Sequence, residues 1–563
     1  MIRRTFAFLF VLLATCCTVR AAESAPGAIE ESAVEIAPLR YMSLQHNQTI
    51  KTFDTYAREM LWAITGKSRL DGHSAAFSVL DMALAPRKYA GRNLVYVRNK
   101  PFREEFQSLQ FLAPEERKRI REEGTLSLAT WFSRDMQSAM SELMARDNIK
   151  ASAIGEIHGG ANRLAQLLDY PNYRGTLMSQ AIVPPSQSTA ANAKPWSTLP
   201  AAAEHVMRHA AGEKHAHDAD DPPAYNDSIE AMAGAMGDLS RGWNGGDATM
   251  VNRAIADLAR GAEGANAAIY PSATKRKFEV AYNGLYRFTL PGAFLYFVAF
   301  VMFLLAWRAQ LKWTYFAAWM TAGVAWAVHL AGIGIRWWLV EKSVGNWFES
   351  IPIKNQFESV LMSAFLGITI ALGVEAFKRM RVFGIAASMV GLLSLVAIFA
   401  APYVSGRDIG GEIRQNAGIL MTYWLYIHVV LVTCSYALIG MTFVMGAWYV
   451  VQYLADRSSP TLKTLDDCNL VMLQLAFWIL GIGIITGALW ADVSWGRPWG
   501  WDPKETFALV TWIVYLIIIH TRFITAGTKR GLTTSVLSIA GFAVMLFNWI
   551  GVNFFLVGLH SYA

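Results

Sequence analysis

Long apolar stretches dominate the second half of the chain. A membrane-crossing helix needs about 20 mostly apolar residues, and eight segments after residue 290 approach or exceed that length. The seventh is the shortest, but aromatic residues flank it. The pattern predicts an all-α polytopic membrane protein whose transmembrane domain occupies residues 289–563. The predicted spans are 291–307, 314–335, 359–377, 382–404, 424–453, 471–489, 506–519 and 535–556.

The first half of the chain has a different pattern. Residues 23–180 mix polar and apolar positions, with helical periodicity near 52–64 and 114–121, and predict a mainly helical domain. Residues 181–228 are rich in Pro, Ala, Ser and Asp, which is typical of a linker. Residues 229–288 regain helical periodicity and predict a helical segment that leads into the membrane domain.

Residues 1–22 have the features of an export signal. Arg3 and Arg4 precede an apolar stretch, and small residues near Ala21 offer a cleavage site. The segment is interpreted either as a cleaved signal peptide or as a retained signal anchor. In both cases the domain that follows is expected on the outer side of the membrane.

Composition supports this organisation and limits the partners. Only 17% of the residues are charged, against about 25% in soluble proteins, and 54% are hydrophobic. The net charge of +7 comes without a basic block or a recognition motif, so no nucleic-acid partner is expected. The four cysteines form no CxxC motif, so the chain is not itself expected to exchange thiols and disulfides.

Basic residues give a modest orientation signal. If the first span runs inward, ten Lys and Arg residues fall in inner loops and seven in outer loops. This agrees with the positive-inside rule and with an outer N-terminal domain.

One predicted outer loop, residues 490–505, is called the tryptophan loop here. It holds Trp490, Trp495, Trp499 and Trp501, separated by glycines and a proline. Tryptophans also form interfacial belts, but a belt spreads them over many helix ends. Four in one glycine-interrupted loop favour a flat aromatic platform for a large planar ligand, whose carboxylates Arg497 and the indole N–H groups would reach.

Three histidines are candidate iron ligands. His428 and His560 fall at the outer ends of the fifth and eighth spans, level with the tryptophan loop, and would suit two faces of a haem. His520 falls near the inner end of the seventh span, where an ionisable group indicates function. Each also has a structural alternative, a hydrogen bond to a backbone carbonyl. That alternative is favoured for His329, and a solvated linker is favoured for the histidine tract 205–217.

The combination of motifs resembles a known family. The tryptophan loop resembles the signature of the haem-handling cytochrome c assembly proteins, and within them the CcsA (ResC) subunit of the System II cytochrome c synthase. The resemblance covers roughly residue 351 to the C-terminus. The motifs that carry it are Trp499-Gly-Trp501-Asp502-Pro-Lys-Glu505-Thr, Asn355-Gln-Phe-Glu358-Ser, Tyr423-Trp-Leu-Tyr-Ile-His428-Val and Gly558-Leu-His560-Ser-Tyr.

The resemblance implies specific roles. His428 and His560 match the external haem-ligating histidines, and His520 matches a transmembrane haem ligand. The substrate would be haem b, attached to the CxxCH motif of apocytochrome c, with a CcsB (ResB)-type membrane subunit and a thioredoxin-like thiol reductant as partners. The setting would be a bacterial-type inner membrane, with the N-terminal domain and the tryptophan loop on the periplasmic side. Asp502 would orient the loop or a histidine.

The resemblance also implies a subunit of a holocytochrome c synthase that acts mainly by positioning haem. Two alternatives remain open at this stage. One is a haem exporter without attachment activity, and the other is an electron-transfer membrane protein with bis-His haem b. The N-terminal domain, with its segment Thr52-Phe-Asp-Thr-Tyr-Ala-Arg58, resembles the extension on larger family members, and its role stays open.

Overall fold

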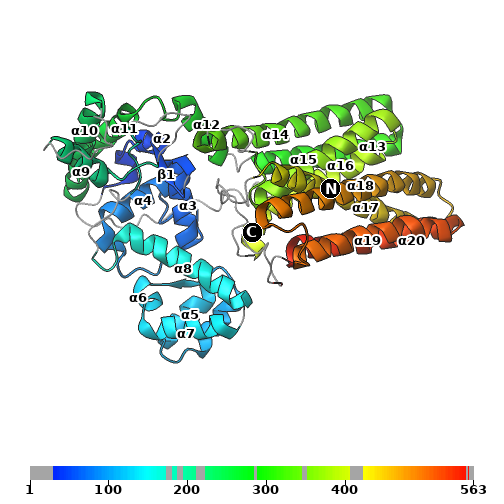
Figure 1. Ribbon diagram of the computed structural model, residues 1–563, viewed down its shortest axis with the longest axis horizontal. Coiled ribbons are helices and arrows are strands. Elements are labelled where there is room, and N and C mark those ends of the chain that lie inside the picture. The colour runs from blue at the N-terminus through cyan, green and yellow to red at the C-terminus, as the bar shows by residue number, and fades with distance from the viewer. Residues whose placement is uncertain are drawn as a thin grey trace, which may run out of the picture.

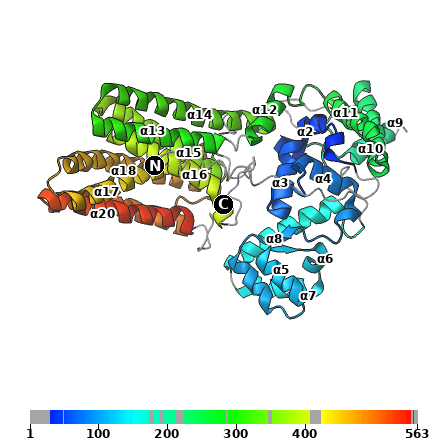
Figure 2. The same ribbon diagram turned by 180° about the vertical axis from the view of Figure 1, so that it is seen from behind.

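The computed structural model describes residues 29–47, 49–146, 148–172, 180–186, 195–210, 222–284, 288–344, 351–405, 422–552 and 556. Figures 1 and 2 show two bodies along the long axis, an N-terminal domain and a bundle of long helices. The described part of the bundle contains eight helices that are long and apolar enough to cross a membrane. The chain is therefore an all-α polytopic membrane protein, as predicted.

The N-terminal domain is mainly helical, with two short antiparallel two-stranded sheets, β1–β2 and β3–β4, in its described part. The predicted helices near 52–64 and 114–121 correspond to α3 and α5. The elements are η1 Glu31–Ala33, α2 Ala37–Tyr41, β1 Ser43–His46, β2 Thr49–Thr52, α3 Phe53–Thr65, α4 Ala75–Leu84, η2 Pro86–Tyr89, β3 Val95–Tyr96, η3 Pro101–Ser108, α5 Pro114–Glu122, β4 Thr125–Leu126, α6 Leu128–Trp131, α7 Arg134–Arg146, α8 Asn148–Leu168, α9 Leu199–Ala210, α10 Pro223–Gly245, α11 Ala248–Ala265 and α12 Ala273–Gly284.

One hydrophobic core runs through this domain, from Val34 to Tyr270. It includes Val183, Trp196 and Leu199, which lie in the segment predicted to be a linker. The structure differs there because scattered apolar residues within a proline-rich stretch still reach the core, and Val183 pairs with Ser197 in an isolated bridge.

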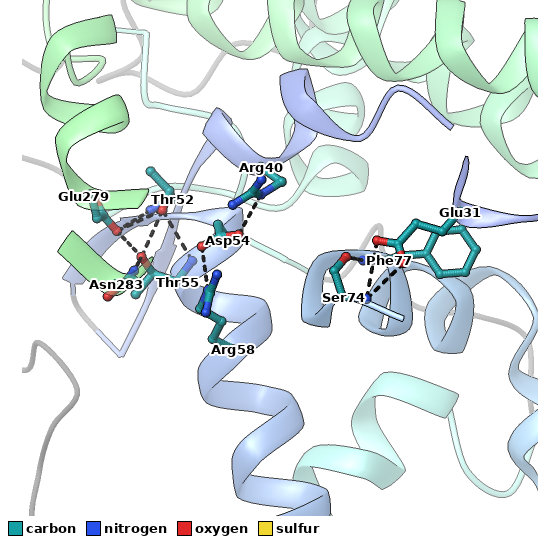
Figure 3. Close-up of polar contacts among 10 residues, drawn as sticks. All are labelled: Glu31, Arg40, Thr52, Asp54, Thr55, Arg58, Ser74, Phe77, Glu279 and Asn283. Carbon is teal, nitrogen blue, oxygen red and sulfur yellow. Dashed lines mark hydrogen bonds and ion pairs between the residues drawn. The ribbon is translucent and has the colours of Figure 1, made fainter. Parts of the chain in front are cut away.

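Figure 3 shows how α12 is fixed to the start of α3. Thr52 caps α3 by accepting a hydrogen bond from the Thr55 backbone N–H. The buried carboxylate of Glu279 in α12 accepts hydrogen bonds from Thr52 N (2.8 Å) and from the Thr55 hydroxyl (2.6 Å). The segment with Thr52 and Thr55 thus ties the start of α3 to α12, the helix that precedes the membrane bundle.

The bundle consists of α13 Thr289–Ala309, α14 Lys312–Val344, α15 Gln356–Lys378, α16 Val382–Ser405, α17 Tyr423–Ala455, α18 Thr461–Trp495, α19 Pro503–Ile524 and α20 Gly527–Leu546, which continues into the π-helix η7 Phe547–Gly551. Each predicted span overlaps one of these helices. The seventh, predicted as 506–519, is longer, because α19 begins directly after Asp502 and runs to Ile524.

The two bodies meet at the end of α14. Leu339 packs with Tyr282 of α12 in a small cluster, and the Trp338 ring contacts Phe278 edge-on at 5.8 Å. The buried ion pair between Arg336 and Glu358 joins this end of α14 to α15 at 2.6 Å. Because consecutive helices alternate in direction, the same end of the bundle holds the start of α17, the tryptophan loop and the end of α20 (Figure 1).

Candidate functional site

His428 lies on the second turn of α17, where α17 packs closely against α18. Its Nδ1 lies 2.8 Å from the carbonyl oxygen of Gly483. A carbonyl oxygen only accepts, so Nδ1 carries the proton and, in the neutral ring, Nε2 carries the lone pair. A backbone carbonyl often supports a metal-binding histidine in this way. The same bond is also the one that the structural alternative predicts, so the neighbouring tryptophan loop distinguishes the two interpretations.

The His428 ring is also fixed by an aromatic neighbour and by a glycine. Its plane is nearly parallel to that of Trp490, at 6° with centroids 6.2 Å apart. A Cβ atom on Gly487 would lie 2.6 Å from the imidazole, closer than side chains approach one another. Gly487 therefore lets α18 pass directly beside the ring, and Trp490 limits the tilt of the ring.

The four tryptophans form two pairs, and the expected single flat platform is not what the structure shows. Trp490 and Trp495 lie on the last turns of α18 and meet edge-to-face, with centroids 4.7 Å apart and planes at 63°. Trp499 and Trp501 are perpendicular at 5.8 Å. Aromatic quadrupoles favour such edge-to-face contacts. Trp490 is buried, whereas Trp501 is 71% exposed.

The end of the tryptophan loop is held by a capping box on α19. The Asp502 side chain accepts from Lys504 N at 3.1 Å, and Pro503 takes the first helical position. One carboxylate oxygen of Glu505 accepts from both Gly500 N (2.8 Å) and Asp502 N (3.2 Å). Those two donors flank Trp501, whose φ of +57° is unusual for a bulky residue. Glu505 thereby holds the backbone that presents the Trp501 indole outward.

Arg497 follows the C-cap of α18, where Gly496 has a φ of +70°. The Arg497 guanidinium lies against Gly500, where a Cβ atom would overlap it. The cation therefore lies within the tryptophan loop, near Trp499 in sequence, where a carboxylate on a bound ligand would be attracted.

His520 is exposed on α19 and far from the loop. Its Nδ1 lies 2.8 Å from the Leu516 carbonyl oxygen, so this histidine too carries its lone pair on Nε2. It belongs to an exposed apolar stripe with Val510, Ile513, Ile517 and Ile524. Only 17% of the α19 span is buried, against 33–67% in the other spans.

Of the remaining histidines, one is structural and others lie outside the described residues. His329 is buried between α13, α14 and α15, and both its nitrogens bond within the core, as the structural alternative predicts. His560 lies outside the described residues, as does most of the histidine tract 205–217. Among described residues, no group of three His, Cys, Asp or Glu is arranged for a metal ion.

Sequence reasoning missed Gly487, Glu505 and Lys504. The spacing Gly483-Ile-Ile-Thr-Gly487 is a small-xxx-small pattern, which indicates close helix approach in membranes. Asp502-Pro-Lys-Glu505 reads as a capping box with proline at the first helical position. Neither pattern identifies the residue that is contacted across the bundle or the loop. Only the folded structure shows that contact.

Comparison with known proteins places this architecture in a family. A family model described as "Cytochrome C assembly protein" matches residues 353–560. The chain is 26% identical to Protein NrfI of Wolinella succinogenes, over 91% of this chain but only 53% of NrfI. It is 33% identical to the cytochrome c biogenesis protein CcsA of Prochlorococcus marinus (strain NATL1A), over 40% of this chain and 81% of that protein. The CcsA of Chlamydomonas reinhardtii is 31% identical, over 40% of this chain and 63% of that protein.

The two kinds of match differ in extent. The CcsA matches cover 40% of this chain, whereas the likeness to NrfI also takes in much of the N-terminal domain, although this chain spans about half of NrfI. A CcsA relative above 30% identity is matched over most of its length. The chain belongs to the CcsA-type family of cytochrome c assembly proteins.

Proposed function

We propose that this protein is the CcsA-type subunit of a holocytochrome c synthase that holds haem b at the outer end of its bundle and helps attach it to the CxxCH motif of apocytochrome c. One observation carries the proposal. Gly483 and Trp490 fix His428, at the edge of the tryptophan loop, in the neutral tautomer whose Nε2 can ligate iron. A merely structural histidine does not need an aromatic loop beside it.

In this proposal His428 and His560 are the axial ligands of the external haem. Trp495, Trp499 and the exposed Trp501 contact the porphyrin, and Trp490 acts through His428 because it is buried against that ring. Arg497 attracts a propionate. Asp502 and Glu505 hold the loop in place through the cap of α19.

The chemistry of attachment asks mainly for position. Each cysteine thiol of the CxxCH motif adds across one haem vinyl group: sulfur bonds to the inner carbon and the proton ends on the outer carbon. This addition consumes no oxidant or reductant, so the protein contributes by holding the vinyl groups beside the thiols. The histidine of the apocytochrome replaces one axial histidine. A thioredoxin-like reductant keeps the cysteines as thiols beforehand.

His520 would belong to a second, transmembrane haem site. A histidine exposed to lipid is costly, and such groups normally face protein. The exposed stripe around His520, on the least buried span, fits a helix of a separate CcsB (ResB)-type subunit that supplies the second ligand. Haem would enter there from the inner side of a bacterial-type inner membrane. The N-terminal domain and the tryptophan loop would lie on the periplasmic side.

Cytochrome c maturation in cells tests the proposal. His428→Ala and His560→Ala should abolish covalent cytochrome c, and added imidazole should restore part of it by replacing the missing ligand. His520→Ala should lower haem content at both sites. Added imidazole should not restore the supply of haem to the outer site. His205 is a partly buried histidine of α9 in the N-terminal domain, and His205→Ala is the control.

Each rival function predicts another result. A haem exporter would lose external haem in the histidine variants, while attachment to haem supplied from outside would continue. An electron-transfer protein would show haem that quinol reduces and would leave cytochrome c maturation intact. Full maturation in His428→Ala would refute the proposed site.

A further inference from the structure

Lys504 lies in the first turn of α19 and points away from its own helix end. Its ammonium donates to the carbonyl oxygens of Asn548 (2.9 Å) and Trp549 (3.1 Å). A cation in the first turn of a helix meets the positive end of the helix dipole, so the stability of α19 does not explain it. At the end of α20 the dipole is reversed, and a cation is favoured there.

The two carbonyl groups belong to the π-helix η7. A π-turn widens the helix locally, and such turns occur often at functional sites. Here two successive carbonyl groups meet one ammonium. Phe507, one turn after Lys504, also packs edge-on against Phe547, with centroids 4.9 Å apart. The start of α19 and the end of α20 are therefore joined by both a polar and an aromatic contact.

Asn548 extends this link to α17. Its side chain is fully buried, and Nδ2 donates to the Tyr436 hydroxyl at 2.8 Å. Tyr436 also contacts the Trp549 ring, with centroids 5.1 Å apart. It lies about two turns further along the helix that carries His428. The Asn548 Oδ1 atom is buried without a hydrogen-bond partner, so this side chain is kept at a cost in desolvation.

We propose that Lys504 is a positioning residue of the outer haem site. With Asn548 and Tyr436 it forms a bridge from the exit of the tryptophan loop, through the end of α20, to the His428 helix. The bridge sets where Trp499 and Trp501 stand relative to the His428 imidazole. This inference rests on the proposed function, since it concerns the geometry of that same site.

Loss of the bridge should loosen the haem without removing His428. Lys504→Met keeps the length and the apolar stem of the side chain but removes the ammonium. We expect a mixed-spin haem spectrum, return of the low-spin spectrum on addition of imidazole, and a roughly tenfold fall in cytochrome c maturation, the size usual for a ligand-supporting residue. Lys504→Arg keeps charge and donors and should retain most activity.

The experiment uses the full chain, purified with its membrane partner, and compares spectra, imidazole titrations and maturation. Lys463 is an exposed lysine near the start of α18, at the end away from the tryptophan loop. Lys463→Met is the matched control. If Lys504→Met does not accumulate, Tyr436→Phe carries the test, because it removes one hydroxyl and should shift the spectrum in the same direction. If both single variants accumulate, the effects of Lys504→Met and Tyr436→Phe should be less than additive in the double variant.

The outcomes separate the two proposals. If His428→Ala loses the haem while Lys504→Met and Tyr436→Phe match the wild type in spectrum, imidazole response and maturation, the bridge is overturned and the site stands. If the wild type carries no haem, or if His428→Ala keeps its spectrum, the proposed function fails and the bridge fails with it.

Discussion

His329 and His428 are both histidines within membrane helices, yet their hydrogen bonds are opposite. His329 Nε2 donates to the Leu361 carbonyl at 3.0 Å, and Nδ1 accepts from the Tyr296 hydroxyl at 3.3 Å. His428 donates through Nδ1 to a carbonyl, and its ring faces the tryptophan loop. We infer that the nitrogen that donates to the backbone carbonyl, together with the neighbouring tryptophan loop, separates a structural histidine from a candidate ligand.

The largest expected effect is that of His428→Ala. Removal of an iron ligand should lower cytochrome c maturation by about 100-fold or more, beyond what loss of a supporting residue costs. Protein amount in the membrane should stay near that of the wild type, because the ring is only half-buried and lies near the start of α17. Haem staining of cytochrome c in membranes gives the measurement. A reduction below twofold would remove His428 from the site.

Gly487→Ala should have the next largest effect. The new methyl group would lie 2.6 Å from the imidazole and push it away from Trp490, so maturation should fall. The expected loss is about tenfold, as for other residues that orient a ligand. Alanine favours helix over glycine by about 1 kcal/mol, so helix stability is not the cause.

Gly373→Ala in α15 is the matched control, since nothing lies within 4 Å of the added methyl group. Equal activity of both glycine variants would mean that close passage of α18 beside His428 is unimportant.

His329→Phe should act on stability alone. It leaves the Leu361 carbonyl and the Tyr296 hydroxyl without their partner, at a cost of about 1–3 kcal/mol. A lower melting temperature of the detergent-solubilised protein, with an unchanged haem spectrum per mole, is expected. A lost or shifted spectrum in this variant would break the distinction between the two histidines.

The smallest effect should come from Asp502. Asp502→Ala removes the cap of α19 and should cost about 0.5–2 kcal/mol, with a modest fall in haem occupancy. Asp502→Asn keeps a capping oxygen and should behave nearly as wild type. If Asn is as harmful as Ala, the carboxylate has a role beyond the cap. Thermal unfolding and haem content per mole measure both effects.

The sequence predicted the spans and their number because apolar length is a local property. It also placed His428 level with the tryptophan loop, since both lie near helix ends. It could not show that Trp490 stacks on His428, because that contact depends on the register of α17 against α18. The linker prediction failed at Val183 and Trp196, where a proline-rich composition hid residues that reach the core.

Other features were beyond any local pattern. The number and spacing of the tryptophans suggested a flat platform. The angles between their rings depend on the turn at Gly496 and on the αL backbone of Trp501, which the spacing does not show. The π-helix at Phe547–Gly551 alters helical periodicity by a single residue, too little to notice in sequence. The contact of Lys504 with two carbonyl groups of that turn was therefore beyond prediction from sequence.

The most direct test of an outer haem site built on His428 is a reduced-minus-oxidised spectrum of the purified protein, with and without its membrane partner. The account predicts a low-spin, bis-histidine haem b spectrum that His428→Ala loses and His329→Phe keeps. A spectrum that survives His428→Ala, or protein without haem from haem-replete cells in both preparations, would contradict it.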